Sequence, residues 1–149
     1  MKRFWAALLF SLWFVMPAYA QVDLIPLEGE SLRNAHAGRT LEGIYKVPRQ
    51  RTGTDLFTET FNTDGTTEYR EGSITDTGYW TVSDKLLCFR YLGPLAGGTD
   101  CFVIFQSCTC YYAYTPRELG RDEMPRDPNR WTVKAIFRGD ISTCDDLVS

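Results

Sequence analysis

The cysteine content constrains the folding of this 149-residue chain more than any other feature of its sequence. An odd number of cysteines leaves at least one thiol outside any set of intramolecular disulfides. In an oxidising compartment paired cysteines are the default, whereas cytosolic thiols stay reduced. The compartment therefore decides how to interpret the five cysteines, which are Cys88, Cys101, Cys108, Cys110 and Cys144.

The N-terminus has the three parts of a cleavable export signal. Residues 1–3 carry positive charge, residues 4–16 are almost entirely apolar, and residues 17–20 form a small-x-small cleavage pattern. We therefore expect a signal peptide over residues 1–20 and a mature chain that begins at Gln21. The apolar stretch is short for a membrane span, and no stop-transfer segment follows it. The sequence predicts a periplasmic or secreted protein with no membrane association after cleavage.

Cleavage would leave an acidic chain that is rich in aromatic residues. The signal contains two basic and no acidic side chains, so its removal changes the formal net charge from −3 to −5. Such a chain has little electrostatic attraction to nucleic acid or to an anionic membrane surface, and it would attract a basic partner or a cation. Aromatic residues favour strands. We expect a single β-rich domain that is monomeric.

The mature chain divides into a lead-in over residues 21–39 and a β-domain over residues 40–149. The lead-in contains a short helix, expected at residues 28–37, with Gly38 as its stop. Alternation of apolar and polar residues then predicts about eight strands. They cover residues 40–47, 55–61, 66–71, 78–82, 86–91, 100–106, 110–115 and 131–138. A meander of this kind must bury its apolar face, and closure also removes exposed edges, so we predict a small antiparallel lipocalin-like barrel.

Residues 62–65 (Asn, Thr, Asp, Gly) form the strongest hairpin signal in the chain. A two-residue turn on the Asp-Gly pair would place Glu59 opposite Arg70, whereas a four-residue loop would place Glu59 opposite Glu68. Like charges directly opposed are unfavourable, so we favour the first register. We expect Glu59, Glu68 and Glu71 to form a solvated face of this hairpin.

Two disulfides are predicted from the cysteine spacing. Cys88 and Cys101 flank a glycine-rich loop almost symmetrically, so they would face each other across a hairpin. One of Cys108 and Cys110 is expected to pair with Cys144 and so pin the tail. We assign Cys110 to this disulfide and Cys108 as the free thiol candidate, although the spacing leaves the choice between the two open.

A sharper alternative makes Cys108 and Cys110 a thiol or copper-handling site, because two thiolates at this spacing can bind Cu(I) or Zn. His36 is the only histidine, and no Cys/His set at zinc spacing is present. A redox thiol would need a helix N-terminus or a neighbouring base to lower its pKa. Structural disulfides are therefore preferred, and we expect no metal and no cofactor.

Candidate ligand contacts are aromatic. Tyr112 and Tyr114 share one face of an expected strand, and Trp80 lies on another strand. Residues 116–130 form a long charged connection, which suits a partner-binding loop or a lid. No pair of carboxylates is recognisable as an acid/base pair, and His36 is interpreted as a packing or surface residue outside the barrel. We assign no catalytic residue.

Several short motifs together resemble an uncharacterised family of small secreted bacterial β-rich proteins. The matching residues are Leu32-Arg33, Gly38 to Gly43, Phe61, Asp64-Gly65-Thr66, Gly78 to Val82, Leu87-Cys88, Cys101 and Gly139-Asp140. The resemblance covers most of the mature chain. It implies a secreted bacterial origin and a scaffold role for Cys88, Cys101 and the Gly-Tyr-Trp motif, but it implies no activity.

The sequence thus favours a non-enzymatic exported protein that binds a small ligand or a protein on a disulfide-stapled barrel. Two alternatives remain open. The first is an inhibitor of a basic secreted enzyme such as lysozyme, which would suit the acidic charge. The second is the thiol or copper-handling protein that would use Cys108 and Cys110.

Overall fold

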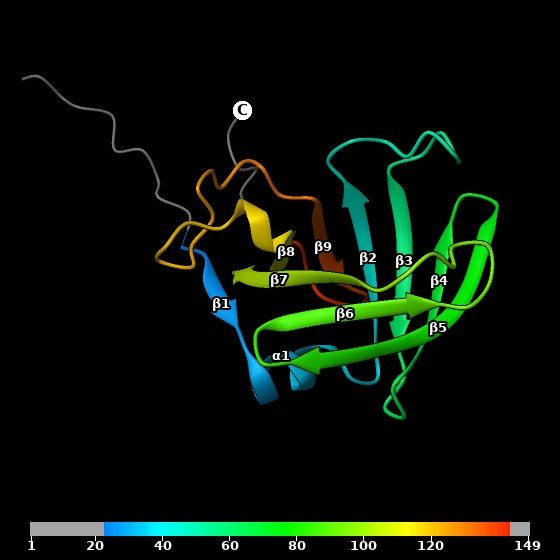
Figure 1. Ribbon diagram of the computed structural model, residues 1–149, viewed down its shortest axis with the longest axis horizontal. Helices are drawn as coiled ribbons and strands as arrows, with labels where there is room; N and C mark the ends of the chain where they lie inside the picture. The colour runs from blue at the N-terminus through cyan, green and yellow to red at the C-terminus, as the bar shows by residue number, and fades with distance from the viewer. Residues whose placement is uncertain (1–22, 144–149) are drawn as a thin grey trace, which may run out of the picture.

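The computed structural model describes residues 23–143, which fold mainly into antiparallel strands (Figure 1). The expected signal peptide and Cys144 lie outside the described residues. In chain order the elements are β1 (Ile25–Leu27), α1 (Gly29–His36), β2 (Arg39–Tyr45), β3 (Leu56–Phe61), β4 (Thr66–Glu71), β5 (Ile74–Ser83), β6 (Leu86–Tyr91), β7 (Asp100–Ser107), β8 (Cys110–Tyr114), the 3₁₀ turn η1 (Pro116–Glu118) and β9 (Val133–Phe137).

The strands form a closed barrel. From β2 to β9, each strand pairs antiparallel with the next one in the chain. β9 also pairs antiparallel with β2, which joins the last strand to the first. Within the described residues, eight strands therefore make a closed meander, and the predicted all-β barrel is confirmed. β1 adds to the wall by pairing with the second half of β7.

The two ends of the barrel differ in how they are covered. At one end, α1 lies against β2 and β5, and the strands are joined by tight turns (Figure 1). Leu32 of α1 is fully buried in the barrel core, and the Gly29 amide donates to the carbonyl of Asp84 in the β5–β6 turn. At the other end are the connections of residues 46–55, 92–99 and 115–132. We call this second end the loop end.

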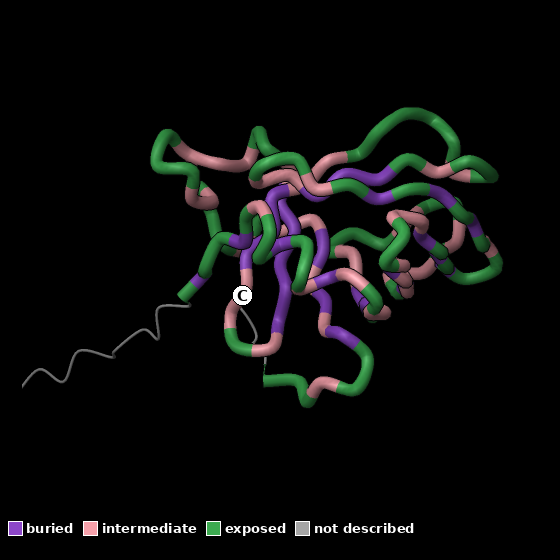
Figure 2. Tube along the Cα trace, turned by 90° about the horizontal axis from the view of Figure 1, so that it is seen from below, coloured by how far each residue is buried: buried purple, intermediate pink, exposed green. Residues whose placement is uncertain are grey.

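The barrel interior is packed mainly with aromatic and aliphatic side chains. Along β3, β4 and β5, buried residues alternate with more exposed ones, as expected for strands with one face toward the core (Figure 2). In β3, for example, Phe57 and Phe61 are buried, and Glu59 between them is buried as well. The alternation that predicts the strands thus also decides which polar residues enter the core.

A second, smaller core lies apart from the barrel interior. It contains Leu24, Val103, Phe105, Cys110, Tyr112 and Tyr114. Leu119, Met124 and Trp131 of the 115–132 connection pack against it. This connection therefore covers a patch of apolar side chains on β7 and β8. The Tyr114 hydroxyl donates to the Pro128 carbonyl at 2.7 Å, which holds the connection in place.

The register predicted for the β3–β4 hairpin is wrong by one residue. Glu59 lies opposite Tyr69, and Arg70 lies opposite Thr58. The cause is a three-residue loop, in which Gly65 has a positive φ of 88°. Glu59 lies between Phe57 and Phe61 on the inner face of β3, and its partner Tyr69 is buried as well.

The predicted disulfide between Cys88 and Cys101 is confirmed, and the two residues are direct partners in the β6–β7 register. Cys110 is also disulfide-bonded, but its expected partner, Cys144, lies outside the described residues. Cys108 is exposed and is the free cysteine of the described part of the chain. It occupies the β7–β8 turn with a φ of 52°.

We predict that Gly78→Ala destabilises the fold by about 2 kcal/mol, a typical cost of overpacking. A Cβ atom at Gly78 would lie 2.3 Å from the carbonyl oxygen of Arg90 and 2.9 Å from Cα of Tyr91, both in the backbone of β6. Urea unfolding of the two proteins measures the change in free energy. The matched control is Gly97→Ala, where the nearest atom is 3.9 Å away. Equal stability of the two variants would contradict this close approach of β5 and β6.

Candidate functional site

A cavity of about 130 Å³ lies inside the barrel. Its walls are largely aromatic, and they come from β2, β3, β4, β6, β7, β8 and β9. The aromatic lining residues are Tyr45, Phe57, Phe61, Tyr69, Phe89, Tyr91, Phe102 and Tyr111. Two other lining residues, Arg51 and Asp100, are exposed at the loop end, so the cavity reaches solvent there.

The cavity exists because small residues face inward on three neighbouring strands. Gly43 of β2 lies opposite Ala135 of β9. Ala135 is also the partner of Tyr111 on β8, and Ala113 follows two residues later on the same face. Both alanines line the cavity. A Cβ atom on Gly43 would lie 2.5 Å from the Phe57 ring, so this glycine makes room for an aromatic wall residue.

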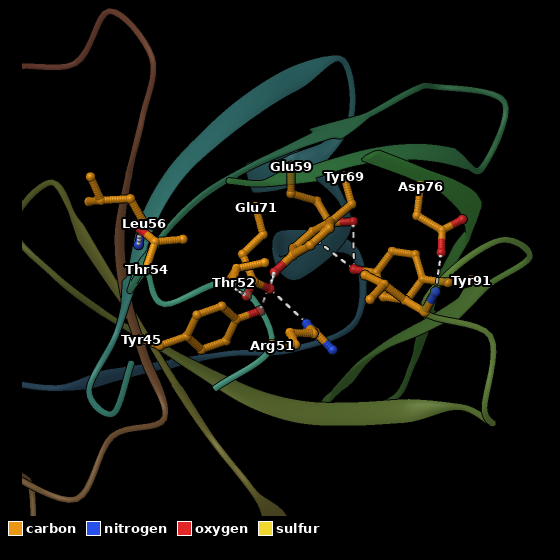
Figure 3. A network of polar contacts seen from close by, with 11 residues as sticks. Tyr45, Arg51, Thr52, Thr54, Leu56, Glu59, Tyr69, Glu71, Asp76 and Tyr91 are labelled. Carbon is orange, nitrogen blue, oxygen red and sulfur yellow. Dashed lines mark hydrogen bonds and ion pairs between the residues drawn. The ribbon is translucent and has the colours of Figure 1, made fainter. Parts of the chain in front are cut away.

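A buried carboxyl group ties the 46–55 connection to the barrel wall (Figure 3). The side chain of Glu71 has no exposed surface. Its Oε2 accepts from the Arg51 guanidinium and from the Tyr69 hydroxyl, each at 2.6 Å, and its Oε1 accepts from Thr52. The Tyr69 hydroxyl also lies 2.8 Å from that of Tyr45. Arg51 and Thr52 both belong to the connection, so this network fixes it over the loop end.

The network determines the charge of Glu71. Burial by itself raises the pKa of a carboxyl group, because it disfavours the charged form. Here the Arg51 guanidinium and the hydroxyls of Thr52 and Tyr69 outweigh burial, and the pKa of Glu71 is below its ordinary value. Glu71 is therefore ionised at neutral pH, and Arg51 balances its charge.

Glu59 is buried, and it forms no ion pair with any described residue (Figure 3). Its Oε2 accepts from the Tyr91 hydroxyl at 2.8 Å, and its Oε1 lies 2.7 Å from Oγ1 of Thr67. Oγ1 of Thr67 is also 2.8 Å from the Thr60 carbonyl oxygen. The single hydroxyl proton of Thr67 cannot be donated fully to both the Glu59 carboxyl group and the Thr60 carbonyl. If Glu59 is protonated, it donates to the Thr67 hydroxyl, and Thr67 donates to the Thr60 carbonyl. Burial raises the pKa of Glu59 to about 8, in agreement with a neutral side chain.

His36 forms part of the cavity lining from the helix end. Its Nδ1 lies 2.8 Å from the Leu32 carbonyl oxygen, and its ring packs edge-on against Phe61, Tyr111 and Phe137. Burial lowers the pKa of His36 to about 4, so the ring is neutral at pH 7. The sequence interpretation placed His36 outside the barrel, but α1 carries it into the barrel end.

Arg49 contributes a positive charge at the loop end of the cavity. Its guanidinium carbon lies 4.0 Å from the centre of the Tyr45 ring, a cation–π geometry. The Nε atom of Arg49 is buried and has no hydrogen-bond partner within the described residues. Arg49 and Tyr45 both line the cavity.

Asp76 anchors the 92–99 connection, which also contributes to the cavity (Figure 3). It is a buried residue of β5. Its Oδ1 accepts from the Gly93 amide at 2.8 Å, and its Oδ2 accepts from the Leu95 amide at 2.7 Å. Leu95 lines the cavity, so Asp76 positions part of the cavity mouth.

The aromatic residues expected to contact a ligand lie elsewhere. Tyr112 and Tyr114 are 1% and 0% exposed in the second core, beneath the 115–132 connection. Trp80 lies in the barrel core, where its Nε1 donates to the Asn62 carbonyl near the helix end. None of these three lines the cavity. Tyr111, on the other face of the same strand, does.

The expectation that Glu59, Glu68 and Glu71 form a solvated face is wrong for two of them. Glu68 is exposed, but Glu59 and Glu71 are buried on the inner face. A signal for Glu71 was present in the sequence: it shares a strand face with Tyr69, two residues before it. Glu59 likewise alternates with Phe57 and Phe61.

Comparison with known proteins yields no match to a protein-family model, a curated protein or a solved structure. The resemblance to small secreted bacterial proteins therefore stays a prediction. Among the described residues, no group of three or more His, Cys, Asp or Glu side chains is placed to hold a metal ion. No helix in the described part of the chain is long and apolar enough to cross a membrane.

We predict that Glu59 makes the fold less stable as the pH rises. Between pH 4.5, the ordinary pKa, and about 8, the folded state binds one proton more than the unfolded state. The free energy of unfolding then falls by up to about 1.4 kcal/mol per pH unit, and this loss is complete above the folded-state pKa. In the variant Glu59→Gln, the new side chain has the shape of glutamate but does not ionise. The free energy of unfolding of this variant, measured with urea between about pH 5 and about pH 9, should therefore depend less on pH.

The control for this prediction is Glu68→Gln, which changes an exposed carboxyl group on the same hairpin. It should retain the pH dependence of the unmodified protein. If Glu59→Gln shows that same dependence, Glu59 is not a neutral group in the folded state.

Proposed function

We propose that this chain is an exported, non-enzymatic binding protein that holds a small organic molecule inside its barrel. The observation that carries the proposal is the aromatic cavity of about 130 Å³, which opens at the loop end. Ligand sites in proteins are typically concave and apolar, with a few placed polar groups. The hydroxyls of Tyr45, Tyr69 and Tyr91 and the carboxyl group of Glu59 supply such groups.

The volume limits the size of the ligand. An engineered cavity of about 150 Å³ lined by apolar side chains binds benzene. The cavity here is of similar size, and it is extended by an open mouth. We therefore expect a molecule with a single small ring or a short branched chain, whose polar end points toward the loop end.

Export is part of the proposal. The signal-like sequence of residues 1–20 and the Cys88–Cys101 disulfide both suit the periplasm or the extracellular space. The disulfide needs an oxidising compartment to persist.

The two alternative functions have less support. An inhibitor acting through a projecting acidic loop would use the 115–132 connection, but this connection carries four basic and four acidic side chains and packs against the second core. A copper site of Cys108 and Cys110 needs both thiolates, and Cys110 is disulfide-bonded.

The test uses three probes of one shape and different charge, namely benzoate, benzamide and benzamidine. At least one of them should shift the NMR signals of cavity residues such as Phe57 and Ala135. Ala113→Leu fills part of the cavity and should weaken that binding by about tenfold or more. Ala96→Leu makes the same change in an exposed loop and should leave binding unaltered. If no probe shifts the cavity residues, or if Ala113→Leu binds as tightly as the unmodified protein, the proposal is contradicted.

A further inference from the structure

We propose that the cavity selects an aromatic carboxylate, with the carboxylate group at Arg49 and the ring among the aromatic side chains of the barrel interior. This inference rests on the proposed function and specifies the chemical class of its ligand. Three observations support it: the charges of the cavity lining, the hydrogen bonding of Arg49, and the position of Arg49 relative to the apolar walls.

Among the described residues, one positive charge of the cavity lining has no ion-pair partner. Four lining residues are arginine, aspartate or glutamate: Arg49, Arg51, Glu59 and Asp100. Arg51 is paired with Glu71 at 2.6 Å, and Glu59 is in its neutral form. Asp100 is exposed to solvent. No described residue forms an ion pair with Arg49, so its charge is available to an anion.

Arg49 also has an unused hydrogen-bond donor. The N–H of its Nε is buried without an acceptor in the described part of the chain, although buried polar groups in proteins are nearly always paired. A guanidinium group presents Nε and one Nη as a planar fork, which matches the two oxygens of a carboxylate. Packing on the Tyr45 ring at 4.0 Å restricts the plane of this fork.

The position of Arg49 indicates where the aromatic ring of the ligand lies. Arg49 follows β2 in the connection at the loop end, whereas Phe57, Phe61 and Phe89 line the cavity from within the barrel. If the ligand's carboxylate contacts the Arg49 guanidinium, the ligand's aromatic ring occupies the apolar interior of the cavity. The neutral state of Glu59 matters here, because an ionised carboxyl group in the barrel would repel an anion.

The experiment compares the affinities of benzoate, benzamide and benzamidine by NMR titration at pH 7. In the unmodified protein, benzoate should bind about tenfold more tightly than benzamide, and benzamidine should bind most weakly. Arg49→Gln should abolish the preference for benzoate over benzamide, because benzoate loses more binding than the neutral probe does. Arg90→Gln removes a positive charge from the exposed face of β6 and should preserve the preference.

A second variant keeps the test decisive if Arg49→Gln is poorly folded. Arg49→Lys retains the charge but lacks the planar fork. Its preference for benzoate should therefore lie between that of the unmodified protein and that of Arg49→Gln. If benzamide binds in the cavity and Arg49→Gln or Arg49→Lys keeps the full preference for benzoate, the role of Arg49 is overturned while the proposed function stands. If none of the three probes binds, the proposed function itself fails.

Discussion

The pairing of β9 with both β8 and β2 is the constraint on which the other features of this protein depend. It converts a meander of hairpins into a closed surface with an inside and an outside. Every inward side chain must then pack, find a polar partner or border a cavity. The helix end is filled by Leu32 and His36 of α1, so access to the interior is confined to the loop end.

Closure also forces two carboxyl groups into the core, and the protein accommodates them differently. Glu71 lies at the end of β4, within reach of the 46–55 connection, and Arg51 compensates its charge. Glu59 lies one strand away and two residues deeper, where Tyr91 and Thr67 are its partners. A charge in that position would be costly because hydroxyl groups alone do not replace hydration, so Glu59 is neutral.

The sequence was sufficient for features that depend on neighbouring residues. Alternation and turn residues predicted a meander barrel, and symmetric spacing predicted the Cys88–Cys101 disulfide, both of which the structure contains. It was insufficient where a single residue of register or a distant segment decides the outcome. The three-residue loop ending at Gly65 places Glu59 opposite Tyr69 instead of Arg70. Tyr112 and Tyr114 were candidate ligand contacts, but the 115–132 connection, which follows them in the chain, packs over the core that contains them.

The cavity itself depends on small residues, and their arrangement argues for a binding role. Barrels of eight strands are just wide enough for side chains to fill the interior. Ala113 of β8 and Ala135 of β9 line the space, which larger residues would fill, and Gly43 of β2 leaves room for the Phe57 ring. A cavity reduces stability because its walls lose packing contacts. Arg49, which lines this space, has a buried Nε–H with no acceptor among the described residues. A ligand that fills the space and accepts from this N–H restores both the packing contacts and the hydrogen bond.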